Sequence, residues 1–179
     1  SKADVDLAVK VSKDAFESWK ETTKEERIKL LENLLSVYKK RFSEMTEAIS
    51  IEMGAPMDWS SNVQNASGQA HLEDFIIRLK NFKFDEQFDS KSNNQIFYEP
   101  IGVCGLITPW NWPINQIALK VIPALATGCT MILKPSEIAP VSAMLFAEMI
   151  HEAGFPPGVF NLINGDGAGV GTCISGHPD

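Results

Sequence analysis

Apolar residues recur every three or four positions through the first 80 residues, which is the spacing of a buried helix face. The pattern predicts one helix over residues 5–19, a second over 28–42 with a break around Ser43, further helix over 45–53, and a third helical region over 58–80. Two of these helices begin with the capping-box spacing of a hydroxyl and a carboxylate three residues apart: Ser1 and Asp4, Thr23 and Glu26.

Beyond residue 100 the pattern changes to short apolar runs that alternate with helical stretches. Strands are predicted over residues 103–108, 130–133 and 159–163, and helices over 114–127, 141–153 and, for a shorter one, after Gly167. Strands and helices in alternation form parallel sheets with right-handed crossovers. The expected fold class is therefore α/β: a Rossmann-like parallel sheet with flanking helices, preceded by a helical segment.

A polar stretch separates the two patterns. Residues 85–94 indicate a loop or hairpin, and Gln95-Ile-Phe-Tyr-Glu99 indicates a strand. Mixed charge beside apolar side chains permits pairing at an exposed sheet edge, and a surface loop closed by an ordinary edge strand is the alternative.

Composition narrows the choice of partners. The chain has 179 residues, of which 44% are hydrophobic, so it can bury a core. Its net charge is −7 and it has no run of basic residues, which argues against nucleic acid and anionic membranes. No apolar run approaches the roughly 18 residues of a membrane span, and the first ten residues do not resemble a signal peptide. A cytoplasmic location is expected.

The three cysteines are widely spaced. Cys104, Cys129 and Cys173 each lie in or beside an apolar segment, which suits buried, reduced thiols better than disulfides or a metal site. No metal is expected.

Two loops after predicted strands carry candidate chemistry. Asn111 lies in a turn bracketed by Pro109 and Pro113, at the carboxyl end of a strand, where ligands gather in open α/β sheets. From the turn alone, a hydrogen bond to local backbone is the more ordinary use of asparagine. The glycine-rich turn Asn164-Gly-Asp-Gly-Ala-Gly-Val-Gly171 either presents amides to a phosphate or is a plain tight turn.

Five ordered motifs give the chain a resemblance to a known family. They are Pro109-Trp-Asn-Trp-Pro113, Pro123-Ala-Leu-Ala-Thr-Gly128, Leu133-Lys-Pro-Ser-Glu137, Glu152-Ala-Gly-Phe-Pro-Pro-Gly-Val159 and Asn164-Gly-Asp-Gly167. In order and spacing they resemble the NAD(P)-dependent aldehyde dehydrogenase superfamily. The resemblance covers nearly the whole chain but well under half of a family member. It implies an amino-terminal portion that lacks the catalytic domain.

The resemblance also implies an organisation. Residues 1–84 correspond to the helical part of the cofactor-binding domain, 85–100 to an oligomerisation hairpin, and 101–179 to an incomplete Rossmann-like NAD-binding core. The implied assembly is a homodimer or homotetramer.

The activity implied by the resemblance is oxidation of an aldehyde to a carboxylic acid through a cysteine thiohemiacetal and thioester. Asn111 corresponds to the oxyanion-hole donor, a role suited to an amide because it donates without titrating. None of the three cysteines matches the family nucleophile, and the general-base glutamate also falls outside the chain. The 179 residues alone are therefore expected to be inactive.

The same matching gives the cofactor and substrate residues. Lys134 and Glu137 correspond to contacts of the adenosine ribose, and a capping role for Glu137 stays open. A carboxylate there repels a 2′-phosphate, which favours NAD over NADP. The remaining matches are the wall along the cofactor (Ile107, Thr108, Pro109, Trp110), the turn beside adenine (Gly165, Gly167) and the side facing the aldehyde (Trp112, Gln116). Core packing is the alternative for Trp112, and packing is also expected of Trp110.

Two further functions stay open. One is a CoA-acylating or acyl-phosphate-reducing branch of the superfamily. The other is a non-catalytic dinucleotide-binding remnant, against which an oxyanion donor at Asn111 argues weakly.

Overall fold

The computed structural model describes residues 1–89 and 93–179. In chain order, the elements are α1 (Lys2–Trp19), α2 (Lys24–Lys40), α3 (Phe42–Met53), α4 (Met57–Trp59), the π-helical η1 (Ser60–Asn65), α5 (Ala66–Asn81), β1 (Asp85–Gln87), β2 (Gln95–Phe97), β3 (Val103–Ile107), α6 (Pro113–Thr127), β4 (Thr130–Lys134), α7 (Val141–Glu152), β5 (Phe160–Leu162), the π-helical η2 (Gly167–Gly171) and α8 (Thr172–Ser175). The predicted α/β class is confirmed.

The strands β3, β4 and β5 form a parallel sheet in that order. Val103 pairs with Thr130 and Ile107 with Lys134, while Met131 pairs with Phe160. All five residues of β4 are buried, as expected of the middle strand of a covered parallel sheet. β5 is two residues shorter than the predicted strand over 159–163.

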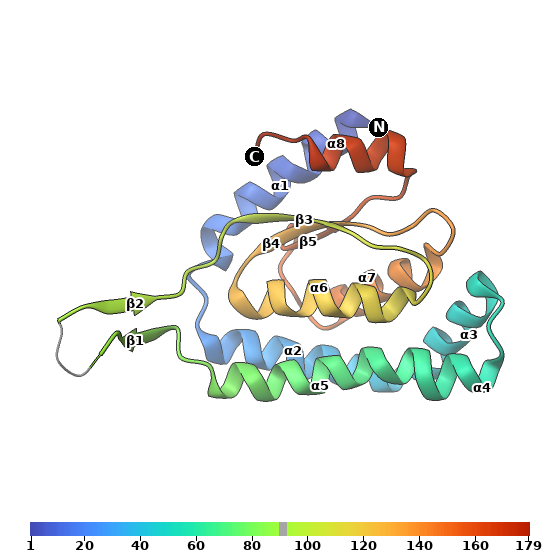
Figure 1. The fold of residues 1–179 in the computed structure, drawn as a ribbon, viewed down its shortest axis with the longest axis horizontal. Coiled ribbons are helices and arrows are strands. Elements are labelled where there is room, and N and C mark those ends of the chain that lie inside the picture. Colours follow the sequence, from blue (N-terminus) through green and yellow to red (C-terminus); the bar gives the residue numbers. More distant parts are fainter. Residues whose placement is uncertain (90–92) are drawn as a thin grey trace.

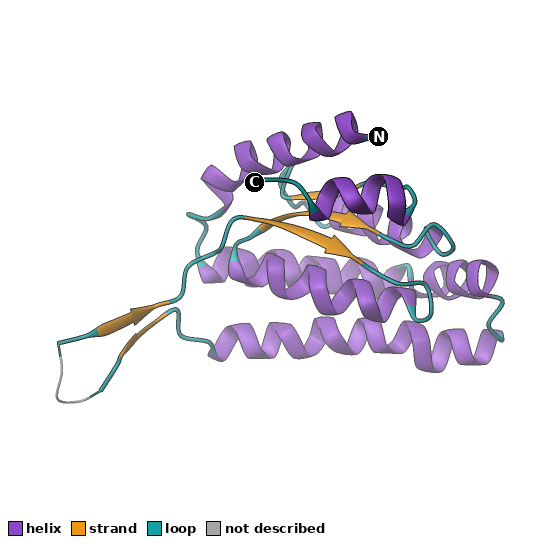
Figure 2. Ribbon diagram, turned by 45° about the horizontal axis from the view of Figure 1, so that its top comes forward, coloured by secondary structure: helices purple, strands orange, loops and turns teal. Residues whose placement is uncertain are grey.

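Helices cover both faces of this sheet. Figures 1 and 2 show α1 and α8 on one side and α6 and α7 on the other, with α2 and α5 forming a further layer beyond them. The smaller apolar cluster, under α1, joins Val5 and Val9 to Ile132 and Val170. Because side chains alternate across a strand, Ile132 enters this cluster while Met131 and Leu133 enter the larger one on the opposite face.

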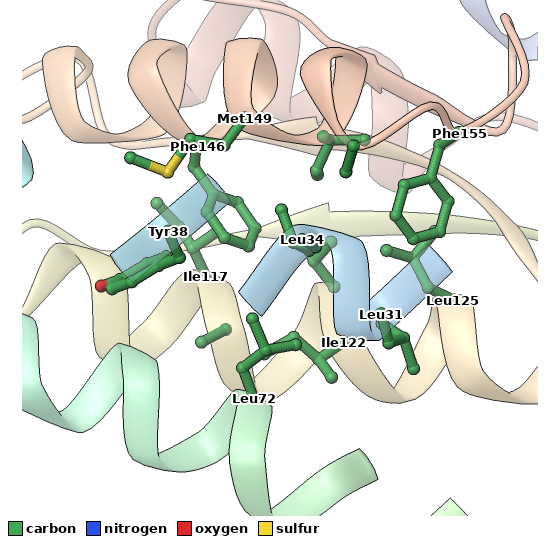
Figure 3. Packing of buried hydrophobic residues seen from close by; sticks show 14 of the residues in the cluster. Leu31, Leu34, Tyr38, Leu72, Ile117, Ile122, Leu125, Phe146, Met149 and Phe155 are labelled. Atoms are coloured by element: carbon green, nitrogen blue, oxygen red, sulfur yellow. The ribbon is translucent and has the colours of Figure 1, made fainter. Parts of the chain in front are cut away.

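The larger cluster is shared among α2, α5, α6 and α7 (Figure 3). Leu34 and Tyr38 of α2, Leu72 of α5 and Ile117 of α6 are completely buried at its centre. Burial of side chains of this size stabilises a fold by roughly 1.5–3 kcal/mol each. This packing fixes α6, the helix that follows the Asn111 turn.

The predicted helical region over residues 58–80 is interrupted by η1, whose last residue organises a polar contact within the core. Asn65 accepts a hydrogen bond from Tyr38 Oη on its Oδ1 (2.5 Å) and donates from Nδ2 to the carbonyl of Phe42 (2.7 Å) and to Thr46 Oγ1 (2.8 Å). Burial raises the pKa of the Tyr38 hydroxyl, so it remains a donor. Three helical segments are thereby tied together.

β1 and β2 pair in antiparallel register, Asp85 opposite Phe97, and project from the body as an arm (Figure 1). A hairpin that starts in the predicted polar stretch 85–94 and ends in β2 is thus confirmed, and residues 90–92 lie outside the described part. Phe88 and Phe97 are 63% and 65% exposed. β2 ends before Tyr98, so the strand is shorter than the predicted one.

All three cysteines are free thiols, as expected, but only Cys129 is buried. Cys104 and Cys173 are half-buried, so the prediction of buried thiols was wrong for these two: Cys104 lies on an edge strand and Cys173 on the short α8. Among residues 1–89 and 93–179, no helix combines the length and apolarity needed to cross a membrane.

Replacing Tyr38 with Phe removes the donor to the buried Asn65. We expect the free energy of unfolding to fall by about 1–2 kcal/mol, because Asn65 Oδ1 loses this hydrogen bond in the core. Urea unfolding of the purified chain measures this. The exposed Tyr98, whose hydroxyl donates to Glu86, is the control, and Tyr98→Phe is expected to change stability by less than about 0.5 kcal/mol. Equal effects would contradict the assignment.

Candidate functional site

The carboxyl ends of β3, β4 and β5 meet at one edge of the sheet, where Lys134 ties them together. Its main-chain carbonyl accepts a hydrogen bond from the N–H of Thr108 just after β3 (3.1 Å). Its side chain is only 2% exposed, and Nζ donates to the carbonyl oxygens of Pro135 and Gly165 (both 2.7 Å) and to Glu137 Oε2 (3.3 Å). One residue therefore fixes the loops that follow all three strands.

The direction of this lysine follows from the strand's period of two. Thr130, Ile132 and Lys134 point to the same face, toward α1 and η2. Thr130 Oγ1 donates to the carbonyl of Ser12 in α1 (3.0 Å), and the Lys134 stem passes beside Gly171, where an added Cβ would lie 3.6 Å from Lys134 Cε. A buried ammonium is tolerated there because three acceptor oxygens lie within hydrogen-bond distance of it.

Glu137 leaves its carboxylate 53% exposed at this edge. A hydrogen bond from its own main-chain N–H, and then one from Lys134, lowers the pKa of Glu137 below its ordinary value. The group is thus anionic at neutral pH and directed by a buried cation.

The capping role left open for Glu137 belongs to a different glutamate. Glu52 of α3 accepts hydrogen bonds on Oε2 from the N–H groups of Val141 (2.6 Å) and Ser142 (3.2 Å), at the start of α7, and its Oε1 accepts from the Ser142 hydroxyl. Burial raises the pKa of Glu52 against the opposing effect of these bonds. Sequence reasoning missed Glu52 because its partners lie about 90 residues away.

The glycine-rich turn after β5 contains its own cap. Gly165 has φ +157°, and a Cβ there would come within 2.4 Å of Val170 Cγ2, so a side chain does not fit. Asp166 Oδ1 accepts from the N–H of Gly169 (2.7 Å), which uses that amide for the turn itself. Gly167 is exposed.

The turn between β3 and α6 presents apolar surface and one amide. Ile107 is 41% and Trp110 47% exposed, and Pro109 is exposed beside them. Packing was expected of Trp110, but about half of this residue is exposed to solvent. Thr108 is buried, and its hydroxyl finds no hydrogen-bond partner among the residues that the structure describes.

Asn111 is exposed, and its side chain forms no hydrogen bond with any described residue, so the local backbone bond considered from the sequence is absent. Trp112, at the N-cap of α6, is half-buried, and its Nε1 is buried without a partner in the described part of the chain. Gln116 follows one turn later and is half-buried, its N–H bonded to the carbonyl of Trp112 (3.1 Å).

A polar pair that the sequence did not indicate joins α5 to the first turn of α6. His71 Nε2 of α5 and Asn115 Oδ1 are 2.7 Å apart, and both residues are half-buried. The residues are 44 positions apart, so only the packing of α5 against α6 reveals the pair.

Lys134→Met keeps the length of the side chain and removes its three donated hydrogen bonds. We expect a loss of roughly 2 kcal/mol in unfolding free energy, because the carbonyls of Pro135 and Gly165 lose a charged donor while the relief of a buried charge offsets part of the effect. Thermal and urea unfolding measure it. The exposed Lys29 provides the control: Lys29→Met is expected to be nearly neutral. A neutral Lys134→Met would refute the role.

Comparison with known proteins agrees with this geometry. The model of the aldehyde dehydrogenase family matches residues 1–179. A 3-succinoylsemialdehyde-pyridine dehydrogenase from a Pseudomonas species is 49% identical over 176 residues, which are 98% of this chain and 36% of that protein.

Solved structures give the same result. An aldehyde dehydrogenase from Bartonella henselae is 55% identical with a TM-score of 0.98, over 100% of this chain and 38% of that one. A mutant of aldehyde dehydrogenase C from Pseudomonas syringae, crystallised with NAD+ and octanal, is 44% identical with a TM-score of 0.96, over 99% of this chain and 36% of that one. The chain spans little more than a third of the length of these relatives. The resemblance inferred from the motifs is confirmed, and the chain belongs to the aldehyde dehydrogenase family.

Proposed function

We propose that this chain supplies the oxyanion donor and part of the dinucleotide site of an NAD-dependent enzyme that oxidises an aldehyde to a carboxylic acid. The observation that carries the proposal is the edge of the sheet where an unengaged amide, Asn111, and an exposed carboxylate, Glu137, follow adjacent strands joined by Lys134. Crystallisation of the Pseudomonas syringae relative with NAD+ and octanal supports it.

Asn111 has the properties of an oxyanion donor. When a nucleophile attacks an aldehyde, negative charge develops on the carbonyl oxygen, and a fixed N–H directed at that oxygen stabilises the transition state. The prolines at positions 109 and 113 restrict the turn, and no described residue competes for the Asn111 amide.

The carboxyl edge of the sheet fits NAD. Ile107 and Trp110 offer exposed apolar surface along one side, and the turn after β5 has no side chain at positions 165 and 167. Glu137 can accept hydrogen bonds from ribose hydroxyls, in an orientation set by Lys134. When bound, NAD supplies the hydride acceptor for the oxidation.

The substrate path is proposed to run along the start of α6. Trp112 follows Asn111 directly and Gln116 lies one helical turn after Trp112, and the contact between His71 and Asn115 adds polar groups on the side of α5. These residues would line the approach of a small aldehyde.

The nucleophile is not among the thiols of this chain. Cys104 and Cys129 lie near the amino ends of β3 and β4, at the opposite edge of the sheet from Asn111, and Cys173 lies on α8. The reactive cysteine and the base are therefore proposed to come from further polypeptide, and the 179 residues alone are expected to be inactive. Turnover without CoA by the longer protein would favour the hydrolytic branch over the acylating one.

The β1–β2 arm is proposed to join a neighbouring subunit in a homodimer or homotetramer. It projects from the body, and its strands have exposed edges and exposed phenylalanines. Unpaired strand edges with apolar side chains favour pairing with another chain.

Asn111→Ala, made in a polypeptide of the relatives' length, is expected to lower kcat by about 10²–10³-fold, because one oxyanion donor is lost. Steady-state NADH formation measures this, and the KM for NAD is expected to stay within about threefold, since the substitution leaves the ribose contacts intact. Asn81→Ala, at the far end of α5, is the matched control. Unchanged turnover in Asn111→Ala would remove the oxyanion role from Asn111. No turnover by the unsubstituted polypeptide of that length would favour the non-catalytic, dinucleotide-binding alternative.

Glu137→Gln tests the cofactor preference. Loss of the carboxylate removes repulsion of a 2′-phosphate and weakens the bonds to ribose hydroxyls, so the ratio of kcat/KM for NAD over NADP is expected to fall at least about fivefold. Glu47→Gln, another exposed glutamate, is expected to leave the ratio unchanged. A ratio that does not move in Glu137→Gln would show that this carboxylate does not contact the ribose.

A further inference from the structure

A hollow of about 470 Å³ opens at the base of the β1–β2 arm, away from the Asn111 turn. It lies where the end of α1, the start of α2 and the two connections of the arm come together (Figure 1). Phe16, Phe84 and Tyr98 contribute aromatic walls, and Arg27 contributes a cation.

Arg27 is only 6% exposed, yet its side chain forms no hydrogen bond or ion pair with the described residues. Its Nε is buried without a partner. Burial lowers the pKa of this guanidinium, and the groups whose charge acts on it, Cys129, Glu25 and Glu26, are not bonded to it. An arginine keeps its charge in proteins. A buried arginine without a counter-charge is unusual, because desolvation of the charge lowers the stability of the fold.

The Arg27 guanidinium is nevertheless held in place. Cζ lies 5.0 Å from the centroid of the Phe84 ring, a cation–π contact. On another side it lies against the main chain at Gly128, where an added Cβ would come within 2.2 Å of Nη1. The group is thus preorganised by packing, and none of the described residues accepts a hydrogen bond from it.

The other polar and charged groups around the hollow either bond to other residues or form no contact with Arg27. Lys20 pairs with Glu17 (2.8 Å), and the Tyr98 hydroxyl donates to Glu86 (2.9 Å). Glu21 and Glu99 also line the hollow, but in the described structure neither reaches Arg27. Arg27 is therefore the unused cation of this site.

We propose that this hollow binds a carboxylate, received by Arg27 through charge-assisted hydrogen bonds and flanked by the aromatic side chains. A planar guanidinium matches the two oxygens of a carboxylate, and the rings favour a flat or apolar group attached to it. The carboxylate comes either from a small molecule or from a further part of the polypeptide. The inference does not rest on the proposed oxidation of aldehydes.

Benzoate is the probe, and benzamide, of the same shape without charge, is the matched control. In the 179-residue chain, benzoate titrated by NMR is expected to shift the signals of the Arg27 side chain and the Phe84 ring. Arg27→Met is expected to weaken benzoate binding at least about tenfold, while Lys29→Met, at an exposed position that does not line the hollow, changes it less than about threefold. Benzamide is expected to bind at least about tenfold more weakly than benzoate.

Circular dichroism and urea unfolding separate binding from folding. Because Arg27 forms no hydrogen bond or ion pair with the described residues, Arg27→Met is expected to keep the fold and unfold at the same or a higher urea concentration. If Arg27→Met fails to fold, Arg27→Lys serves instead, with binding weakened by loss of the planar fork. No shift with benzoate, equal binding by the Arg27 variant, or equal binding of benzamide would each overturn the proposal.

A polypeptide of the relatives' length distinguishes the two sources. If the natural ligand is a small carboxylate, benzoate is expected to bind that protein as it binds the 179-residue chain. If a carboxylate of the polypeptide occupies the hollow, benzoate binds only the shorter chain, and Arg27→Met destabilises the longer protein alone.

Discussion

The ammonium of Lys134, buried at the carboxyl edge of the sheet, is the interaction on which the candidate site depends. A charge in that position is tolerated only because it donates hydrogen bonds to the carbonyls of Pro135 and Gly165, each 2.7 Å away. These two hydrogen bonds fix the loops after β4 and β5. The same residue's carbonyl holds the N–H of Thr108 after β3. Loops that bear functional residues are usually mobile, and here the side chain of Lys134 holds two of them and its main-chain carbonyl holds the third.

The helical layers extend this order to α6. Asn65 joins Tyr38, Phe42 and Thr46 within the core, and α5 then packs against α6 directly behind the turn that carries Asn111. The amide of Asn111 is therefore attached to a rigid body although it is itself exposed. An electrostatic catalyst needs this combination, because a donor that must reorganise during the reaction loses much of its effect.

Sequence periodicity was sufficient for the alternating strands and helices after residue 100, since fully apolar strands such as β4 and amphipathic helices leave clear patterns. The motifs that carry the family resemblance also indicated Asn111, Lys134 and Glu137 as candidate site residues.

Long-range polar contacts left no such trace. Glu52 caps a helix about 90 residues away, and His71 meets Asn115 across 44 positions. The break at η1 was also missed, because no glycine or proline lies within residues 60–65 and the buried hydrogen bonds of Asn65 are visible only in the fold. Nothing in the sequence sets Arg27 apart from the other charged residues, and only the fold shows that it is buried.

Hydrogen–deuterium exchange on a polypeptide of the relatives' length, with and without NAD+, tests the central claim most directly. If the carboxyl edge of the sheet holds the dinucleotide, NAD+ slows exchange in three separate segments, residues 107–111, 134–137 and 165–167, and leaves the β1–β2 arm unchanged. NAD+ binding with unaltered exchange in those three segments would contradict the account.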